Sequence, residues 1–440
     1  MSRHTHRIVA GLLFLLIAGG YLLMALYFPF AYIFATYEDR VGEWAQVYFF
    51  AAAMVLACIH AVRIRRYRPF YLLLALACFY VVGEEISWGQ RIFDIETPEF
   101  FRRHNLQQET NLHNLFIGPR GTGISSAIKA IQLAISAGLF LFGLVYPLLL
   151  RLRVRPALWL DRIGLPSPPL YLFPFFLLSA WLELGPYHFN EAEVAEILIS
   201  SALGMMALHS LHRNRQTAPE PAPSSSFSVR LSLAMLALFL GVGVLAAGTT
   251  WVYYQTPHLR ERMDSRYLNE VENFADRCRR LELWKNAIDL YRYVQVREPG
   301  RASVSRSLYR CYQALNNQEM MRQSLADAIA IDRQRLEDRP DSITARVSMA
   351  SSYILAGDLD HARAYLLQGL KIAKDRQRQY PGSAGTAYWL GTIYYMLGQP
   401  QAAYPQYRRA AELQPSNLRY RGALRAVEIY LSQKEDSDAP

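Results

Sequence analysis

Long apolar segments dominate the first 255 residues of the chain, and shorter amphipathic segments fill most of the rest. A helix needs about 20 mostly apolar residues to cross a bilayer. We therefore expect seven membrane-spanning helices, at residues 8–28, 41–62, 69–88, 128–150, 168–188, 193–211 and 229–253. The pattern predicts an all-α protein that begins with a seven-helix transmembrane bundle.

The first apolar segment also suggests a signal peptide, because it follows Arg3 and Arg7. Its apolar run is longer than a signal peptide needs, and no small-residue cleavage motif ends it. Tyr21, Tyr27 and Phe28 resemble the aromatic belt found where a span meets the membrane surface. We therefore interpret this segment as the first span.

The distribution of charge predicts the orientation of the spans. If the N-terminus is cytoplasmic, the inner segments carry 13 arginines and the outer segments six basic residues. Only two carboxylates, Asp161 and Glu220, are then inside, and 13 lie outside or within the spans. This asymmetry obeys the positive-inside rule. An odd number of spans places the C-terminus outside, so we expect a bacterial inner-membrane protein with a periplasmic C-terminal domain.

Internal repetition marks residues 268–417. The clearest copy covers 384–417 and reads Leu390-Gly391, Tyr394, Leu397-Gly398, Ala403, Tyr407, Ala410 and Pro415. That spacing resembles the tetratricopeptide repeat, in which small residues lie where two antiparallel helices touch. The resemblance implies stacked helix pairs that form a solenoid and bind a protein partner in a concave groove.

Earlier copies are more degenerate, and their spacing changes along the chain. It is 34 residues from Ala287 to Met321, but 41 from Met321 to Ala362 and again from Ala362 to Ala403. The spacing therefore predicts that the two middle units have a lengthened second helix.

These patterns predict the domain boundaries. We expect a six-span bundle at 1–215 with an outer polar loop at 91–127, and a seventh span at 229–255 after a cytoplasmic Pro/Ser linker at 216–228. A repeat domain with a capping helix should cover 256–433, and a disordered tail should follow at 434–440.

Composition narrows the class of function. The chain is 52% hydrophobic but only 19% charged, which excludes a simple soluble enzyme and a disordered chain. Four cysteines are too few for a disulfide-stapled module. Residues 256–440 hold 28 basic and 22 acidic residues, an excess too diffuse to predict nucleic-acid binding.

Unusual polar residues end the third apolar segment. Glu84 and Glu85 are costly there unless they face the bundle interior or an aqueous cavity. If the helix continues, Glu84, Trp88 and Arg91 share one face. In the following loop, Asn105, Glu109 and His113 are four residues apart and would form one stripe of a helix.

Two interpretations of these residues compete. In the first, they are a buried polar network that locks the bundle. In the second, Glu84, Glu85, Glu109 and His113 are catalytic, and a divalent metal is held by Glu85, Glu109, His113 and His188. Glu183 lies on the same side of the membrane and could join such a pocket, and ion or proton passage is a third interpretation. No His-Glu-x-x-His motif or serine nucleophile elbow accompanies them.

The string Glu-Glu-Ile-Ser-Trp-Gly-Gln-Arg at 84–91 resembles a block found in uncharacterised bacterial multi-spanning membrane proteins. That resemblance implies no activity. Two hypotheses follow: a membrane-anchored interaction scaffold that serves envelope or surface-polymer assembly or export, or a metal-dependent hydrolase or transferase embedded in the membrane. We favour the scaffold and keep the enzyme as the alternative, and a divalent metal is the one cofactor that the sequence suggests.

Overall fold

The computed structural model describes residues 4–37, 39–93, 95–104, 109–112, 123–187, 189–214, 225–415 and 417–437. These residues form helices and loops without any strand, which confirms the all-α class. The chain divides into two compact units. The bundle unit comprises 1–98, 109–113 and 127–270, and the repeat unit comprises 99–108, 114–126 and 271–440.

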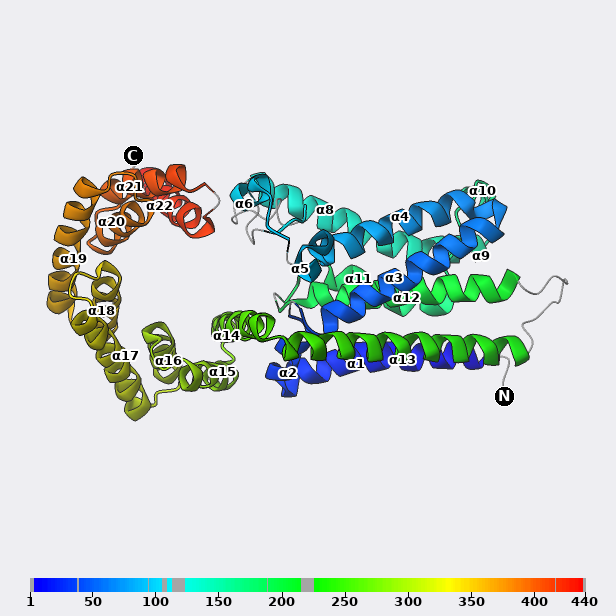
Figure 1. Ribbon diagram of the computed structural model, residues 1–440, viewed down its shortest axis with the longest axis horizontal. Coiled ribbons are helices and arrows are strands. Elements are labelled where there is room, and N and C mark those ends of the chain that lie inside the picture. Colours follow the sequence, from blue (N-terminus) through cyan, green and yellow to red (C-terminus); the bar gives the residue numbers. More distant parts are fainter. Residues whose placement is uncertain are drawn as a thin grey trace. The chain divides into compact units, whose positions relative to one another are not determined.

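Long helices build most of the bundle unit (Figure 1). The elements up to residue 104 are α1 (Thr5–Tyr27), α2 (Pro29–Ala35), α3 (Val41–Arg63), η1 (Arg65–Tyr67), α4 (Arg68–Glu85), η2 (Ser87–Gly89), α5 (Gln90–Phe93) and α6 (Glu99–His104), of which α6 belongs to the repeat unit. From residue 123 onward come α8 (Gly123–Phe140), the π-helical turn η3 (Leu141–Val145), α9 (Tyr146–Arg151), α10 (Arg155–Arg162), η4 (Leu170–Leu172), α11 (Phe173–Leu182), α12 (Glu191–Asn214) and α13 (Ser225–Gln255).

Five helices in the described residues are long and apolar enough to cross a membrane: Thr5–Tyr27, Val41–Arg63, Lys129–Arg151, Glu191–Arg213 and Ser225–Gln255. They coincide with five of the seven expected spans. The other two are shorter. α4 has 18 residues and ends in Glu84 and Glu85, and the apolar helix Leu170–Leu182 begins only after two prolines.

Helix α3 is central to the bundle unit, because it packs against α4, α12 and α13 (Figure 1). Ala53 and Ala57 on α3 are fully buried, and small side chains of this kind let neighbouring helices approach closely. Gly143 in η3 serves the same purpose against α11. A Cβ atom at Gly143 would lie 2.1 Å from the Phe176 side chain, so only glycine fits there.

Antiparallel helix pairs build the repeat unit, as the sequence predicted. They are α14 (Pro257–Arg280) and α15 (Trp284–Arg297), α16 (Ala302–Ala314) and α17 (Gln318–Asp338), α18 (Ile343–Ala356) and α19 (Leu359–Gln379), and α20 (Ala384–Met396) and α21 (Pro400–Leu413), followed by α22 (Leu418–Ser437). Only the part of α14 after Glu270 belongs to this unit. α17 and α19 each have 21 residues, against 14 in α15 and α21, which confirms the lengthened second helices.

Local sequence signals start these helices. Asn317, Ser342, Asp358 and Ser383 each precede a helix, and each side chain accepts a hydrogen bond from the backbone N–H three residues later. Such a cap satisfies one of the backbone donors that a helix leaves unpaired. The boundaries of four repeat helices are therefore specified by the sequence beside them.

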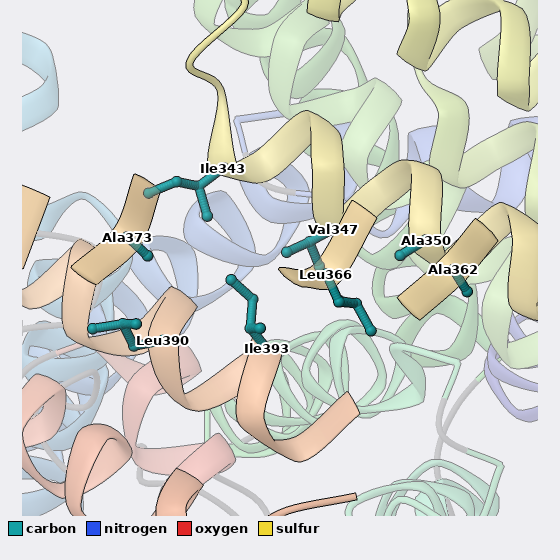
Figure 2. Close-up of a cluster of buried hydrophobic side chains, with 8 residues drawn as sticks. All are labelled: Ile343, Val347, Ala350, Ala362, Leu366, Ala373, Leu390 and Ile393. Atoms are coloured by element: carbon teal, nitrogen blue, oxygen red, sulfur yellow. The ribbon is translucent and has the colours of Figure 1, made fainter. Parts of the chain in front are cut away.

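Apolar side chains from three successive helices fill the core between the last two pairs. The residues, drawn in Figure 2, are Ile343, Val347, Ala350, Ala362, Leu366, Ala373, Leu390 and Ile393. Gly391 is needed nearby because a Cβ atom there would lie 2.7 Å from the Tyr407 ring. This close approach explains the Leu-Gly dipeptide of the repeat pattern.

A polar network joins the second and third pairs. The Arg306 guanidinium lies 3.2 Å from the carboxylate of Asp332, which is fully buried, and it also donates to the Ser348 hydroxyl. Burial raises the pKa of the Asp332 carboxyl, against the opposing effects of Ser348, Arg306 and Arg335. The equivalents of Arg306 and Asp332, 41 residues later, are the apolar Val347 and Ala373.

Candidate functional sites

The predicted continuation of α4 through Arg91 is wrong. The helix ends at Glu85, and Ser87, Trp88 and Gly89 adopt positive φ angles of 49°, 53° and 85°. Only glycine enters this region without strain, so two consecutive side-chain-bearing residues here need support from their surroundings. Glu84 and Trp88 therefore meet across a left-handed turn and not along one helical face.

Glu84 provides part of this support. Its carboxylate is buried and accepts one hydrogen bond from Trp88 Nε1 at 2.9 Å and one from the backbone N–H of Leu112 at 2.7 Å. The Trp88 ring lies against Gly83, where a Cβ atom would come within 2.9 Å of it. Glu84 thus ties the end of α4 both to the turn and to the loop that follows.

Glu109 provides the second connection. Its buried carboxylate accepts from Ser87 Oγ at 2.9 Å and from Asn111 Nδ2 at 3.3 Å, and Arg266 lies 3.6 Å away. Residues 109–112 are not helical, so the expected helical stripe does not form at Glu109. Asn105 and His113, the other members of that stripe, lie outside the described residues. We call Glu84, Ser87, Trp88, Glu109 and Leu112 the outer latch.

Glu85 does not join the outer latch. It lines a narrow hollow with Glu43, Trp44 and Tyr253. The predicted metal ligand His188 lies outside the described residues, as does His113. Within the part of the chain that the structure describes, no three His, Cys, Asp or Glu residues lie together so as to hold a metal ion.

Sequence analysis missed Arg40, which is almost fully buried. Its guanidinium lies over the rings of Phe34 and Tyr267, at 4.3 and 4.8 Å from their centroids, and it donates to the Met263 carbonyl. Met263 and Tyr267 belong to the first part of α14, so Arg40 and Arg266 both hold that segment on the bundle. The position of Arg40 directly before a predicted span could have indicated this role from the sequence.

A second cluster that sequence analysis missed joins α3, α11 and α12. The Gln46 side chain on α3 is fully buried and donates from Nε2 to the carboxylate of Glu196 on α12. Glu183, at the end of α11, and Glu43 add negative charge beside Glu196. Glu183, which was expected in the pocket with Glu84 and Glu109, follows α11 directly and is close enough to Glu196 for their negative charges to repel each other.

The repeat unit carries exposed apolar side chains on α18, α20 and α22. Ile354 on α18 and Tyr395 on α20 are equivalent positions 41 residues apart, and they are 39% and 42% exposed. The Tyr395 ring meets the ring of Tyr430 on α22, with centroids 6.0 Å apart. In Figure 1 these repeat helices form a curve, with α18 and α20 on its inner side and α17 and α19 on its outer side. We call Ile354, Tyr395, Ile429 and Tyr430 the apolar row.

Comparison with known proteins agrees with the geometry of the repeat unit. A family model described as tetratricopeptide repeat matches residues 343–376 and 384–417, which form the last two helix pairs. No curated protein matches the chain. The chain therefore contains tetratricopeptide repeats, a class of module that generally mediates protein–protein interaction.

Solved structures also match the chain, at low similarity. A thermophilic tetratricopeptide-repeat protein of Thermus thermophilus is 22% identical over 43% of this chain and 96% of its own, with a TM-score of 0.24. A human IFIT1 dimer with PPP-AAAA is 14% identical over 86% of this chain and 95% of its own, with a TM-score of 0.16. At these values the similarity carries no functional argument for this chain.

Proposed function

We propose that this protein is an inner-membrane scaffold whose extracytoplasmic tetratricopeptide repeats bind a protein partner, in envelope or surface-polymer assembly or export. The match to the last two repeats supports binding, because such solenoids expose a continuous surface made from equivalent positions. The five long apolar helices support the membrane anchor. The proposal assigns Glu84 and Glu109 to the outer latch, whose hydrogen bonds occupy both carboxylates.

The apolar row carries the binding proposal. Exposed isoleucine and tyrosine side chains lie on α18, α20 and α22, where a soluble surface would favour polar residues. Tyrosine combines a large apolar face with a polar tip and is enriched among residues that dominate interface energies. We infer that the partner inserts apolar side chains beside Tyr395 and Tyr430.

Replacing Tyr395 with serine should weaken binding of the partner about 30-fold, because truncating a central interface aromatic costs about 2 kcal/mol. The partner can be trapped in cells by a photo-crosslinking amino acid at position 354, identified by mass spectrometry, and its affinity then measured with purified full-length protein.

Leu367 on α19 provides the matched control. It is an exposed apolar residue of the same repeat unit but on the second helix of a pair. Leu367→Ser should leave the affinity within about twofold, since scattered exposed leucines carry no function. Equal weakening by Leu367→Ser and Tyr395→Ser, or crosslinks of equal yield at both helices, would contradict the assignment of the apolar row.

The orientation proposal requires α4 and Leu170–Leu182 to complete the crossing of the membrane. An 18-residue helix is about 27 Å long, close to the ~30 Å hydrocarbon thickness of a bilayer. Seven crossings with the N-terminus inside then place the repeats outside. Arginine-rich inner segments such as 63–68 and 151–155 support this orientation.

A topology reporter tests this orientation. Alkaline phosphatase fused after residue 440 should be active, because the enzyme matures only outside the cytoplasm, and a fusion after Arg153 should be inactive. A fluorescent protein that folds only in the cytoplasm should give the opposite pattern. Cytoplasmic signal from the fusion after residue 440 would disprove the seven-span arrangement.

A further inference from the structure

The side-chain amide of Gln46 uses its nitrogen in a hydrogen bond but not its oxygen. Gln46 is fully buried on α3, and its Nε2 donates to Glu196. Among the residues that the structure describes, its Oε1 has no hydrogen-bond partner. Because Oε1 and Nε2 belong to one amide group, the unpaired oxygen lies beside the Glu196 carboxylate. Leaving a buried acceptor unpaired costs about 1–3 kcal/mol. A ligand from solution that pairs with Oε1 is therefore favoured at this position.

The surroundings of this oxygen are negative. Glu183 and Glu43 both act electrostatically on Glu196. Ser179, one turn before Glu183, donates to the Ala195 carbonyl at 3.0 Å and so fixes α11 against α12 beside Glu196. In the described segments, no lysine, arginine or histidine forms an ion pair with Glu183 or Glu196.

Carboxylates without a cationic partner are unfavourable in a low-dielectric bundle. A bound cation would remove this penalty and would also give Gln46 Oε1 a partner. All the available donors are carboxylate or amide oxygens, which suit hard cations and not soft transition metals. Glu183 and Glu196 are only partly buried, so an ion can reach them from the surface.

We propose that Gln46, Glu183 and Glu196 bind one hard cation, an alkali or alkaline-earth ion, near the outer end of the bundle. Glu196 is five residues into α12, about 7.5 Å from the start of the helix. The ion links α3, α11 and α12 and completes its coordination with water. This site shares no residue with the apolar row. The cation proposal can therefore be disproved without affecting the proposal of partner binding, and the reverse also holds.

Equilibrium dialysis of the full-length protein in detergent tests the proposal. Separate measurements with ²²Na⁺ and ⁴⁵Ca²⁺, each with unlabelled K⁺ or Mg²⁺ as competitor, identify the ion. We expect about one ion per chain. Glu196→Gln should weaken binding at least tenfold, and Gln46→Met, which keeps the volume but removes the oxygen, should weaken it about tenfold.

Glu193→Gln is the matched control, because it removes a carboxylate from the same helix three residues earlier. It should retain binding within about twofold. No bound ion in any of these measurements would overturn the proposal and would mean that a proton neutralises the cluster. Equal loss in Glu193→Gln and Glu196→Gln would also overturn it, because general negative charge would then attract the ion. Gln46→Met keeps the test decisive if Glu196→Gln does not fold.

Discussion

Replacing Asp332 with alanine should raise the hydrogen-exchange rates of the backbone amides in α16, α17 and α18 about 100-fold or more. The change leaves the Arg306 guanidinium, 15% exposed, without its carboxylate. Breaking a buried ion pair by removing one partner costs about 3–5 kcal/mol. A loss of about 3 kcal/mol corresponds to a factor above 100 in the population of locally open states. Mass spectrometry of the full-length protein in detergent resolves the exchange by segment.

Replacing both partners gives the informative control. Arg306→Met combined with Asp332→Val changes the total volume little and removes both buried charges, so it should restore most of the lost protection. The raised pKa of Asp332 supports this expectation, because it shows that burial disfavours the charged carboxylate. The same positions one repeat later are Val347 and Ala373, so this architecture accepts apolar residues there. A double variant as poorly protected as Asp332→Ala would refute the argument.

Replacing Glu109 with alanine should open the outer latch. The change removes the acceptor of Ser87 Oγ and Asn111 Nδ2 and the carboxylate beside Arg266. We expect a loss of about 3 kcal/mol, because polar groups that remain buried lose a charged partner. Exchange of the Leu112 amide, which donates to Glu84, should then accelerate about 100-fold. Segment-resolved hydrogen exchange measures this directly.

Glu85→Ala distinguishes the latch from a catalytic cluster. Glu85 is adjacent to Glu84 in sequence but lines the narrow hollow and not the latch. Its replacement should therefore change the exchange of the Leu112 amide by less than about threefold. If Glu85→Ala opened the loop as much as Glu109→Ala, the carboxylates would act as one cluster, as the alternative hydrolase hypothesis supposes.

The repeats show how far local sequence can specify structure. Small residues at Ala362, Gly391 and Ala403 and caps such as Ser342 and Ser383 act within one helix pair, so their spacing predicts that pair. The lengths of α17 and α19 followed from the 41-residue period. The pairing of Arg306 with Asp332 did not, because it joins residues 26 positions apart whose side chains meet only after the pairs have stacked.

The candidate sites were less predictable. Glu84 stood out as a costly residue at the end of an apolar segment, and Glu109 as part of a polar stripe in the loop that follows. The structure brings the two together through Ser87 and Leu112. Their relation depends on a left-handed turn that helical periodicity does not anticipate. The contact of Gln46 with Glu196 spans 150 positions in sequence, and the presence of a glutamine in one apolar helix and a glutamate in another gave no sign of it.

The sequence by itself determined the all-α class, the long apolar helices and the helical repeats, because each follows from periodicity and from contacts between near neighbours. Only the tertiary structure decided which polar groups meet. The end of α4, the acceptors around the outer latch and the unpaired oxygen of Gln46 depend on how separate helices pack. Packing of this kind is set by the shapes and charges of residues distant in the chain, which no local pattern encodes.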